Sequence, residues 1–213
     1  MILKVLEKKW ETEDVFSLVL EKPDNFNFYH GQYLDIGLAN DTRAFTISSS
    51  PTENFIMITT KKGRSRFKKM MEELKIGDLI TTSHPAGTFT LDESSPAIFL
   101  AGGIGITPFR SMIKYVLDKQ ISTSMTLIYS AKGKFAFKTE LDQWKKQLPN
   151  LKINYLNTGK ADRLNRQKLL KTLDPASVYY LVGSHSFVDN LEQVLLNLVV
   201  DKTSVRTDRF DGY

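Results

Sequence analysis

The residues best suited to chemistry form a glycine-rich turn in the segment IFLAGGIGITPFRSM. An apolar run ends in Gly102, Gly103 and Gly105. Glycines let a ligand approach the main chain closely, and a helix that begins at Thr107 and Pro108 offers free N–H groups to a phosphate. The spacing is not the G-x-G-x-x-G of the dinucleotide fold. The Gly-Lys-Ser/Thr that a nucleoside triphosphatase loop requires does not follow either. The turn predicts a phosphate site, with a tight strand-to-helix turn without a ligand as the alternative.

A second group of reactive residue types is the run Arg43-Ala44-Phe45-Thr46. On a strand, Arg43 and Phe45 share one face while Thr46 points to the other. A cation, an aromatic plane and a hydroxyl at this spacing can hold a phosphate, stack on a flat ring and hydrogen-bond its edge. An ordinary strand with a surface arginine is the alternative.

Short alternating runs dominate the chain up to Asp92 and predict antiparallel strands. One helical stretch, 65–74, interrupts them and ends before Gly77-Asp78. This pattern predicts a closed or nearly closed antiparallel β-barrel. The predicted strands lie at residues 2–10, 15–21, 32–38, 43–49, 55–61 and 79–83.

After Asp92 the pattern changes to strict alternation of apolar strands and amphipathic helices, which predicts a parallel sheet covered on both faces. The linker-like DESSP places the boundary so that a barrel domain spans 1–93 and an α/β domain spans 94–213. The predicted strands lie at 97–101, 125–130, 153–157 and 179–182, and the predicted helices at 108–117, 138–148, 166–173 and 187–199.

The composition is that of a folded globular protein, with 213 residues of which 41% are hydrophobic and 25% charged. The chain has no cysteine, which excludes disulfides, thiolate metal sites and a cysteine nucleophile within it and agrees with a cytoplasmic location. No run of apolar residues is long enough for a signal peptide or a membrane span. His30 and His84 lack a second ligand at a suitable spacing, so we expect barrel-rim or surface histidines and no metal.

Taken together and in order, the motifs resemble those of the ferredoxin–NADP reductase superfamily, in which a flavin-binding barrel precedes a pyridine-nucleotide domain. The resemblance covers nearly the whole chain. Its motifs are Gly31-Gln32-Tyr33, Arg43-Ala44-Phe45-Thr46, Lys61-x-Gly63-x-Ser65, Gly77-Asp78, Pro85-x-Gly87-x-Phe89, the glycine turn at 102–108, Tyr180-Leu181-Val182-Gly183 and the ending Phe210-Asp211-Gly212-Tyr213.

The resemblance implies a flavin site on the barrel. Arg43 is expected to pair with the flavin phosphate, and Phe45, where the family usually has tyrosine, to lie against the isoalloxazine or the ribityl chain. Thr46 is expected to place its hydroxyl near the reactive N5. The length and motif order favour FAD over FMN. The expected second flavin anchor comprises Thr60, Lys61, Gly63 and Ser65.

The resemblance also implies a pyridine-nucleotide site. The glycine turn, from Gly102 to Pro108, is expected to bind the pyrophosphate, with Thr107 as a hydroxyl contact. The implied reaction is hydride transfer between nicotinamide C4 and flavin N5, with single-electron exchange with a partner. Most relatives carry Cys-Gly-Pro beside the nicotinamide, whereas this chain has Val182-Gly183-Ser184, which predicts slower hydride transfer or a differently tuned pocket. Tyr213 is expected to cover the flavin face, with a frayed terminus as the alternative.

The net charge of +5 belongs to the second domain, because residues 93–213 carry 17 basic and 11 acidic side chains. By resemblance, the stretch that follows the second strand of that domain holds the adenosine end of the nucleotide and its 2′-phosphate. Its candidate cations favour NADPH over NADH, although a solvated basic face is an equal alternative for each of them. The candidates are Lys132, Lys134, Arg163 and Arg166.

A separate basic run, in the first domain, places six cations between Lys61 and Lys69. Three interpretations stay open: flavin phosphate binding with a solvated face, docking of an acidic electron carrier, and nucleic acid binding. The first two are favoured, so we expect no nucleic acid partner.

The function predicted from the sequence is that of an FAD-dependent NAD(P)H oxidoreductase. It would exchange electrons with a ferredoxin- or flavodoxin-like carrier, or with an oxidase or oxygenase partner. Two alternatives are a flavin subunit of a larger redox complex and a flavin-binding regulatory module with weakened catalysis.

Overall fold

A computed structural model describes residues 1–160, 162–198 and 200–210, and the chain forms two compact units. One unit comprises Met1–Thr90 together with Thr107–Asp118, and the other comprises Leu91–Ile106 together with the chain from Lys119 onward. The helix that follows the glycine turn therefore packs with the first unit, although it lies beyond the predicted cut between residues 93 and 94.

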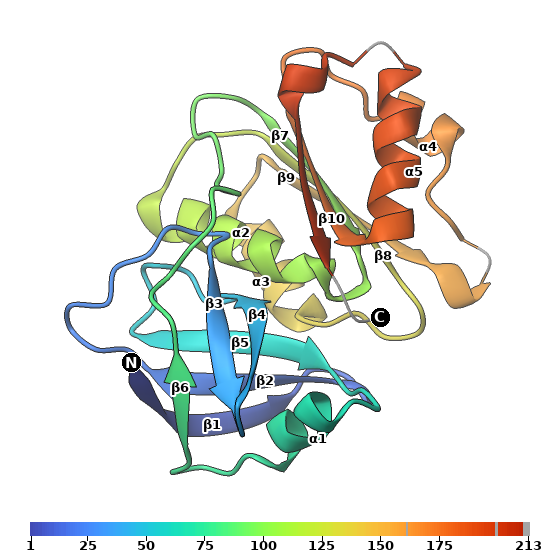
Figure 1. The fold of residues 1–213 in the computed structure, drawn as a ribbon. Helices are drawn as coiled ribbons and strands as arrows, with labels where there is room; N and C mark the ends of the chain where they lie inside the picture. Colours follow the sequence, from blue (N-terminus) through green and yellow to red (C-terminus); the bar gives the residue numbers. More distant parts are fainter. Residues whose placement is uncertain (161, 199, 211–213) are drawn as a thin grey trace. The chain divides into compact units, whose positions relative to one another are not determined.

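The first unit is a barrel of six antiparallel strands in the order β4-β3-β6-β1-β2-β5 (Figure 1). A bridge between Ile47 and Ile58 joins the two outermost strands, and the Ser48 N–H donates to the Met57 carbonyl at 2.8 Å. The barrel is therefore nearly closed, which confirms the predicted fold. Its elements are β1 (Ile2–Trp10), β2 (Val15–Glu21), β3 (Tyr33–Leu38), β4 (Asp41–Thr46), β5 (Phe55–Lys61), α1 (Arg66–Glu73) and β6 (Leu79–Thr82).

Strand β4 ends at Thr46, three residues before the predicted end. The main chain leaves β3 there and crosses to β5, where the Ser49 side chain accepts from the Met57 N–H at 2.9 Å. The alternating residues of the strands fill the barrel interior. Its largest buried side chains include Phe16, Leu3, Leu18, Leu20, Leu34, Ile36 and Ile47.

The second unit is a parallel sheet of five strands in the order β11-β10-β7-β8-β9 (Figure 1). This confirms the predicted α/β class. Helix α2 (Thr107–Lys119) follows η1 (Gly103–Ile106) in the chain but belongs to the first unit as far as Asp118. The other elements of the second unit are β7 (Ala97–Gly102), β8 (Met125–Ala131), α3 (Lys138–Gln147), β9 (Leu151–Asn157), η2 (Thr158–Lys160), α4 (Arg166–Leu170), β10 (Val178–Ser184), α5 (His185–Leu196), η3 (Lys202–Ser204) and β11 (Val205–Phe210).

Helices cover both faces of this sheet, as predicted. On one face, α5 and α4 pack on Ile128 and Leu156 through buried side chains such as Leu191 and Leu169. On the other face, the Tyr155 hydroxyl of β9 donates to the Asp142 carboxylate of α3 at 2.9 Å.

Several elements of the second unit differ from the sequence-based prediction, among them α4, α5 and β11. Helix α4 ends at Leu170 because both the N–H and the hydroxyl of Thr172 donate to the Leu169 carbonyl, at 2.8 and 2.9 Å. Helix α5 ends at Leu196, and Val199, its predicted last residue, lies outside the described residues. Strand β11 was not predicted. Its sequence, VRTDRF, contains three charged residues, whereas the strands of a parallel sheet are expected to be apolar runs.

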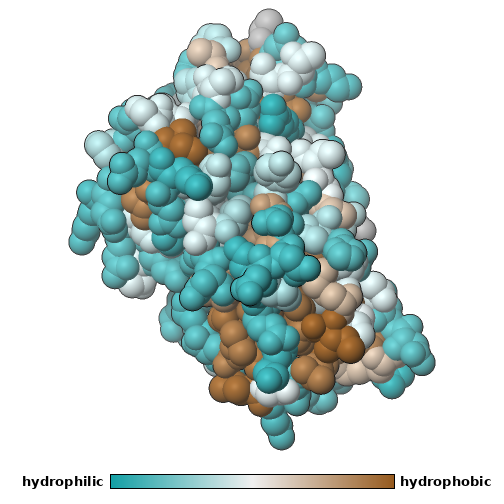
Figure 2. Space-filling model, turned by 90° about the vertical axis from the view of Figure 1, so that its left-hand side faces the viewer, coloured by the Kyte–Doolittle hydropathy of each residue, from teal (hydrophilic) through white to brown (hydrophobic). Residues whose placement is uncertain are grey.

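Exposed apolar side chains include Ile2, Ile76 and Leu79 on the barrel. Figure 2 shows hydrophobic colour gathered over the lower part of the face that it presents. Within the described ranges, no helix is long and apolar enough to cross a membrane.

Candidate functional site

The predicted flavin residues of β4 lie against the start of helix α1. The rings of Phe45 and Phe67 stack, with centroids 5.9 Å apart and planes at 19°. The Arg43 guanidinium carbon lies 5.8 Å from the centre of the Phe67 ring, and the Lys68 ammonium lies 4.8 Å from the centre of the Phe45 ring. Two cations and two aromatic rings therefore meet in one cluster.

The loop before α1 approaches the same cluster. Ser65 caps the helix, and its hydroxyl accepts from the Lys68 N–H at 3.3 Å. A Cβ atom at Gly63 would lie 2.8 Å from the Cγ of Lys68, so a larger residue would displace that side chain. The first turn of α1 holds no acidic residue, so the positive end of the helix is available to an anion.

The remaining predicted flavin residues differ in their surroundings. Thr46 and Thr60 are buried, at 7% and 2% exposure, and the Thr60 hydroxyl accepts a hydrogen bond from the Lys68 ammonium. Lys61 is exposed and pairs with Asp14 at 3.0 Å, so its charge is already matched. The structure therefore brings Thr60 into the cluster and turns Lys61 toward the surface.

The sequence analysis counted Lys68 only as one cation of the basic run and did not select it as a site residue. Its side chain turns inward from α1, and burial lowers the pKa of its ammonium to about 8. The signal available in the sequence was its place on the helix, beside buried Phe67 and three residues before buried Met71.

In the second unit, three of the predicted glycines pack too closely to carry a side chain. A Cβ atom would lie 2.3 Å from the Val182 carbonyl oxygen at Gly105, and 2.8 and 2.9 Å from the Phe187 ring at Gly102 and Gly183. These residues gather at the carboxyl ends of β7 and β10, where the strand order reverses and where open α/β sheets bind ligands.

The turn continues directly into helix α2. Gly103 opens η1 with a φ of +56°, a conformation that glycine adopts at little cost. Thr107 and Pro108 begin α2, and both are buried. Ser130, the residue opposite Gly102 on β8, has a buried hydroxyl without a hydrogen-bond partner among the residues described.

These features provide a test of fit for the two cofactors that the sequence implies. An unmatched buried hydroxyl is costly, and Ser130 beside the glycine turn suits a ligand that supplies its partner. The Arg43, Lys68 and helix-start cluster suits an anion. The residues present therefore fit a nucleotide at the sheet edge and a phosphate on the barrel.

The candidate 2′-phosphate residues lie in loops that follow β8 and β9. Asn157 links the two loops by hydrogen bonds. Its Oδ1 accepts from the N–H groups of Gly133 and Gly159 at 3.2 and 3.0 Å. A Cβ atom at Gly159 would lie 3.4 Å from the Cγ of Lys132, so Lys132 borders this junction. Arg163 and Arg166, before and at the start of α4, are exposed.

The sequence analysis also did not select Asp208, a carboxyl group on the edge strand β11. Asp208 on β11 lies opposite Val182 in the β10 register, and burial raises its pKa above the usual value. The unpredicted strand explains the omission. Tyr213, the predicted aromatic cover, lies outside the described residues.

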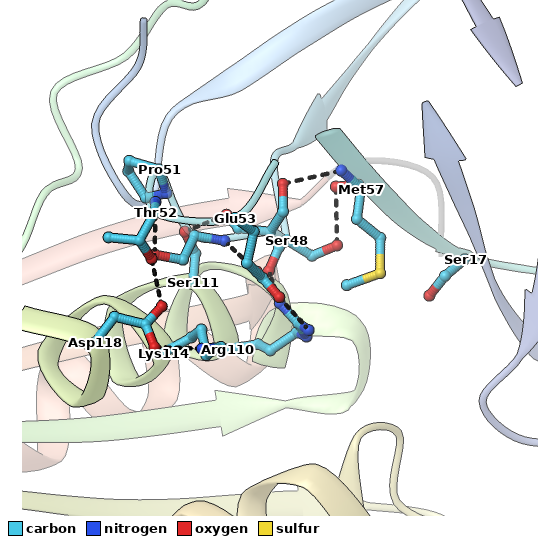
Figure 3. Close-up of polar contacts among 12 residues, drawn as sticks. Ser17, Ser48, Pro51, Thr52, Glu53, Met57, Arg110, Ser111, Lys114 and Asp118 are labelled. Carbon is cyan, nitrogen blue, oxygen red and sulfur yellow. Dashed lines mark hydrogen bonds and ion pairs between the residues drawn. The ribbon is translucent and has the colours of Figure 1, made fainter. Parts of the chain in front are cut away.

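Helix α2 is fastened to the segment that follows Thr46 (Figure 3). The Arg110 guanidinium donates to both carboxylate oxygens of Glu53, at 2.8 and 3.2 Å, and to the Ser48 carbonyl at 3.0 Å. The Ser111 hydroxyl donates to the Ser49 carbonyl at 2.6 Å. Helix α2 is therefore held against the segment that follows β4.

The two histidines named in the sequence analysis differ in their surroundings. His30 is buried against Tyr115, with ring centroids 4.6 Å apart, so a surface position, one of the two expected, was wrong for it. His84 is exposed as expected. In the described part of the chain, no group of three or more His, Cys, Asp or Glu residues could hold a metal ion.

Comparisons with known proteins agree with this arrangement. A family model described as "Oxidoreductase NAD-binding domain" matches residues 99–190. The carnitine monooxygenase reductase subunit of Escherichia coli (strain K12) is 26% identical over 91% of this chain and 57% of its own length. The solved ferredoxin-NADP+ reductase from Plasmodium falciparum shares the fold, with a TM-score of 0.84 and 18% identity over 98% of this chain and 95% of that one. The chain therefore has the fold of this reductase, and its residues 99–190 match the oxidoreductase NAD-binding domain family.

A flavohemoglobin from Malassezia yamatoensis, solved with bound FAD and heme, has the same fold, with a TM-score of 0.87 and 22% identity over 98% of this chain and 59% of that one. The chain spans less than two thirds of the length of that flavohemoglobin and of the carnitine monooxygenase reductase subunit.

Proposed function

We propose that this chain is a reductase module that takes a hydride from NADPH and passes single electrons to an acceptor on a separate protein or domain. The observation that carries the proposal is the presence, in one chain, of a cationic aromatic cluster on a barrel and a glycine-lined sheet edge. FAD supplies the conversion of a hydride into single electrons when it is bound.

The barrel residues would bind and orient the flavin. Arg43 would pair with its phosphate, Phe45 would lie against the ring or the ribityl chain, and Thr46 would present a hydroxyl to the reactive edge. Gly63 and Ser65 would supply main-chain and hydroxyl contacts at the start of α1.

The sheet edge would bind the nucleotide. Gly102, Gly103 and Gly105 would admit its pyrophosphate next to the main chain, and Thr107 would offer a hydroxyl. The unmatched Ser130 hydroxyl supports a ligand at this edge.

The choice of NADPH rests on the cations beyond β8 and β9. Lys132, Arg163 and Arg166 would bind the 2′-phosphate, and their exposure leaves them available to it. We expect kcat/KM for NADPH to exceed that for NADH by about tenfold or more. Lys132→Met should reduce the ratio of the two kcat/KM values. Lys146→Met removes the same charge from an exposed position on α3 and should leave the ratio unchanged. Equal values for the two nucleotides in the unaltered protein would remove the preference.

The acceptor is proposed from the kinds of protein that the chain resembles. One relative is named as a monooxygenase reductase subunit, and another carries heme in the same chain. These relatives support an oxygenase, an oxidase or a small electron carrier as the acceptor.

Anaerobic mixing of the FAD-loaded protein with each nucleotide tests the first half of the reaction. Loss of flavin absorbance with NADPH, followed by reduction of a one-electron acceptor in twofold molar excess over the nucleotide consumed, is the expected result. A flavoprotein that neither nucleotide reduces would instead favour a regulatory module, for which Val182-Gly183-Ser184 in place of Cys-Gly-Pro is the supporting observation.

A further inference from the structure

One cation in the basic run, Lys68, is half-buried and has no matching charge among the residues described. Lys61 pairs with Asp14 at 3.0 Å, and Lys62 pairs with Glu72 at 3.1 Å. Lys68 has no such partner among the residues described, and its ammonium meets only the Thr60 hydroxyl and the Phe45 ring.

The burial of this ammonium is unfavourable in the protein alone. Charged groups inside proteins are normally paired, because a hydroxyl and a ring replace only part of the lost hydration. The pKa of Lys68 falls to about 8 through burial alone, with no nearby carboxylate to oppose the change. A neutral long side chain at this position would therefore suit the apoprotein better.

The surroundings of Lys68 indicate what would compensate for this cost. Its aliphatic stem lies against Gly63, its main-chain N–H is capped by Ser65, and its ammonium faces Phe45. Arg43 reaches the same pair of stacked rings from β4. A second cation and the positive end of α1 therefore border the same space, which favours an anion.

We propose that Lys68 is a cofactor-binding residue that pairs with the pyrophosphate of FAD. This inference rests on the proposed flavin site and adds to it a residue of helix α1. The pyrophosphate is the anionic part of FAD, whereas the isoalloxazine, ribityl and adenosine parts are neutral and would leave the ammonium unmatched.

The test measures flavin binding to the flavin-free protein by quenching of flavin fluorescence. Lys68→Met keeps the stem and removes the charge, and Lys69→Met removes the same charge from an exposed position on the same helix. We expect Lys68→Met to raise the Kd for FAD by at least about tenfold and Lys69→Met to change it by less than about twofold. The Kd for riboflavin, which lacks phosphate, should be the same in all three proteins.

Thermal unfolding of the flavin-free proteins supplies the structural control. We expect Lys68→Met to melt no lower than the unaltered protein, and Lys68→Gln serves as a second variant if the methionine protein does not fold. An unchanged Kd for FAD in a folded variant, or an equal loss of riboflavin affinity, would overturn the role of Lys68 alone. An unaltered protein that binds no FAD would overturn the proposed flavin site as well.

Discussion

The buried ion pair between Arg110 and Glu53 gives the sharpest prediction about stability. Its side chains are 3% and 11% exposed, and the guanidinium contacts both carboxylate oxygens. Arg110→Met would leave the Glu53 carboxylate buried and the Ser48 carbonyl without this donor. Removing one partner of a buried pair costs about 3 to 5 kcal/mol, so we expect a loss of about 3 kcal/mol in the free energy of unfolding of the first unit.

Urea denaturation followed by tryptophan fluorescence measures this loss. The two tryptophans are Trp10 on β1 and Trp144 on α3, so a Trp144→Phe background leaves a reporter in the barrel alone. Glu53→Gln and the double variant complete a mutant cycle, in which we expect a coupling energy above about 1.5 kcal/mol.

The matched control lies one turn along the same helix. Lys114 pairs with Asp118 in a more exposed position, so Lys114→Met should cost less than about 1 kcal/mol. A loss below about 1 kcal/mol for Arg110→Met, or a coupling energy near zero, would refute the view that this pair fastens α2 to the barrel.

Three further predictions follow from single residues. Lys68 binds its proton more weakly in the folded state, where its pKa is about 8, than in the unfolded state, where it is 10.5. Flavin-free protein should therefore gain about 3 kcal/mol relative to Lys68→Met as pH rises through this window, which urea titrations at several pH values will measure. Asp208 binds its proton more tightly when folded, so thermal melts should show the stability advantage of the unaltered protein over Asp208→Asn falling as pH rises above 3.8. Gly105→Ala would bring a methyl group to 2.3 Å from the Val182 carbonyl oxygen and should lower NADPH affinity and the melting temperature together; an unchanged melting temperature would contradict the packing argument.

Local patterns in the sequence were sufficient for most of the fold. Strands β1, β2 and β5 begin and end where alternation of apolar and polar residues predicted, because one face of each lies in the barrel core. The parallel strands β7 and β8 were predictable as apolar runs because both of their faces are covered. The glycine turn was predictable because glycines between an apolar run and a helix start permit the tight backbone turn that such a junction needs.

What could not be predicted depends on contacts between distant segments. An edge strand such as β11 pairs on one side only and tolerates charge, so its sequence lacks the pattern of a buried strand. The inward turn of Lys68 depends on Thr60 and Phe45, which come from two other elements. The roles of Thr46, Arg43 and the cations beyond β8 stay predictions until ligands are bound.

The packing of α2 with the barrel also bears on how such modules are exchanged between proteins. A recombination event that cut the chain between residues 93 and 94 would carry away Arg110 and Ser111 with the second half. The barrel left behind would keep the Glu53 carboxylate inside its wall with no guanidinium to meet it. We therefore expect residues 1–210 to be inherited as a single segment. Fusions to new acceptor domains should be joined outside this segment rather than between the two units.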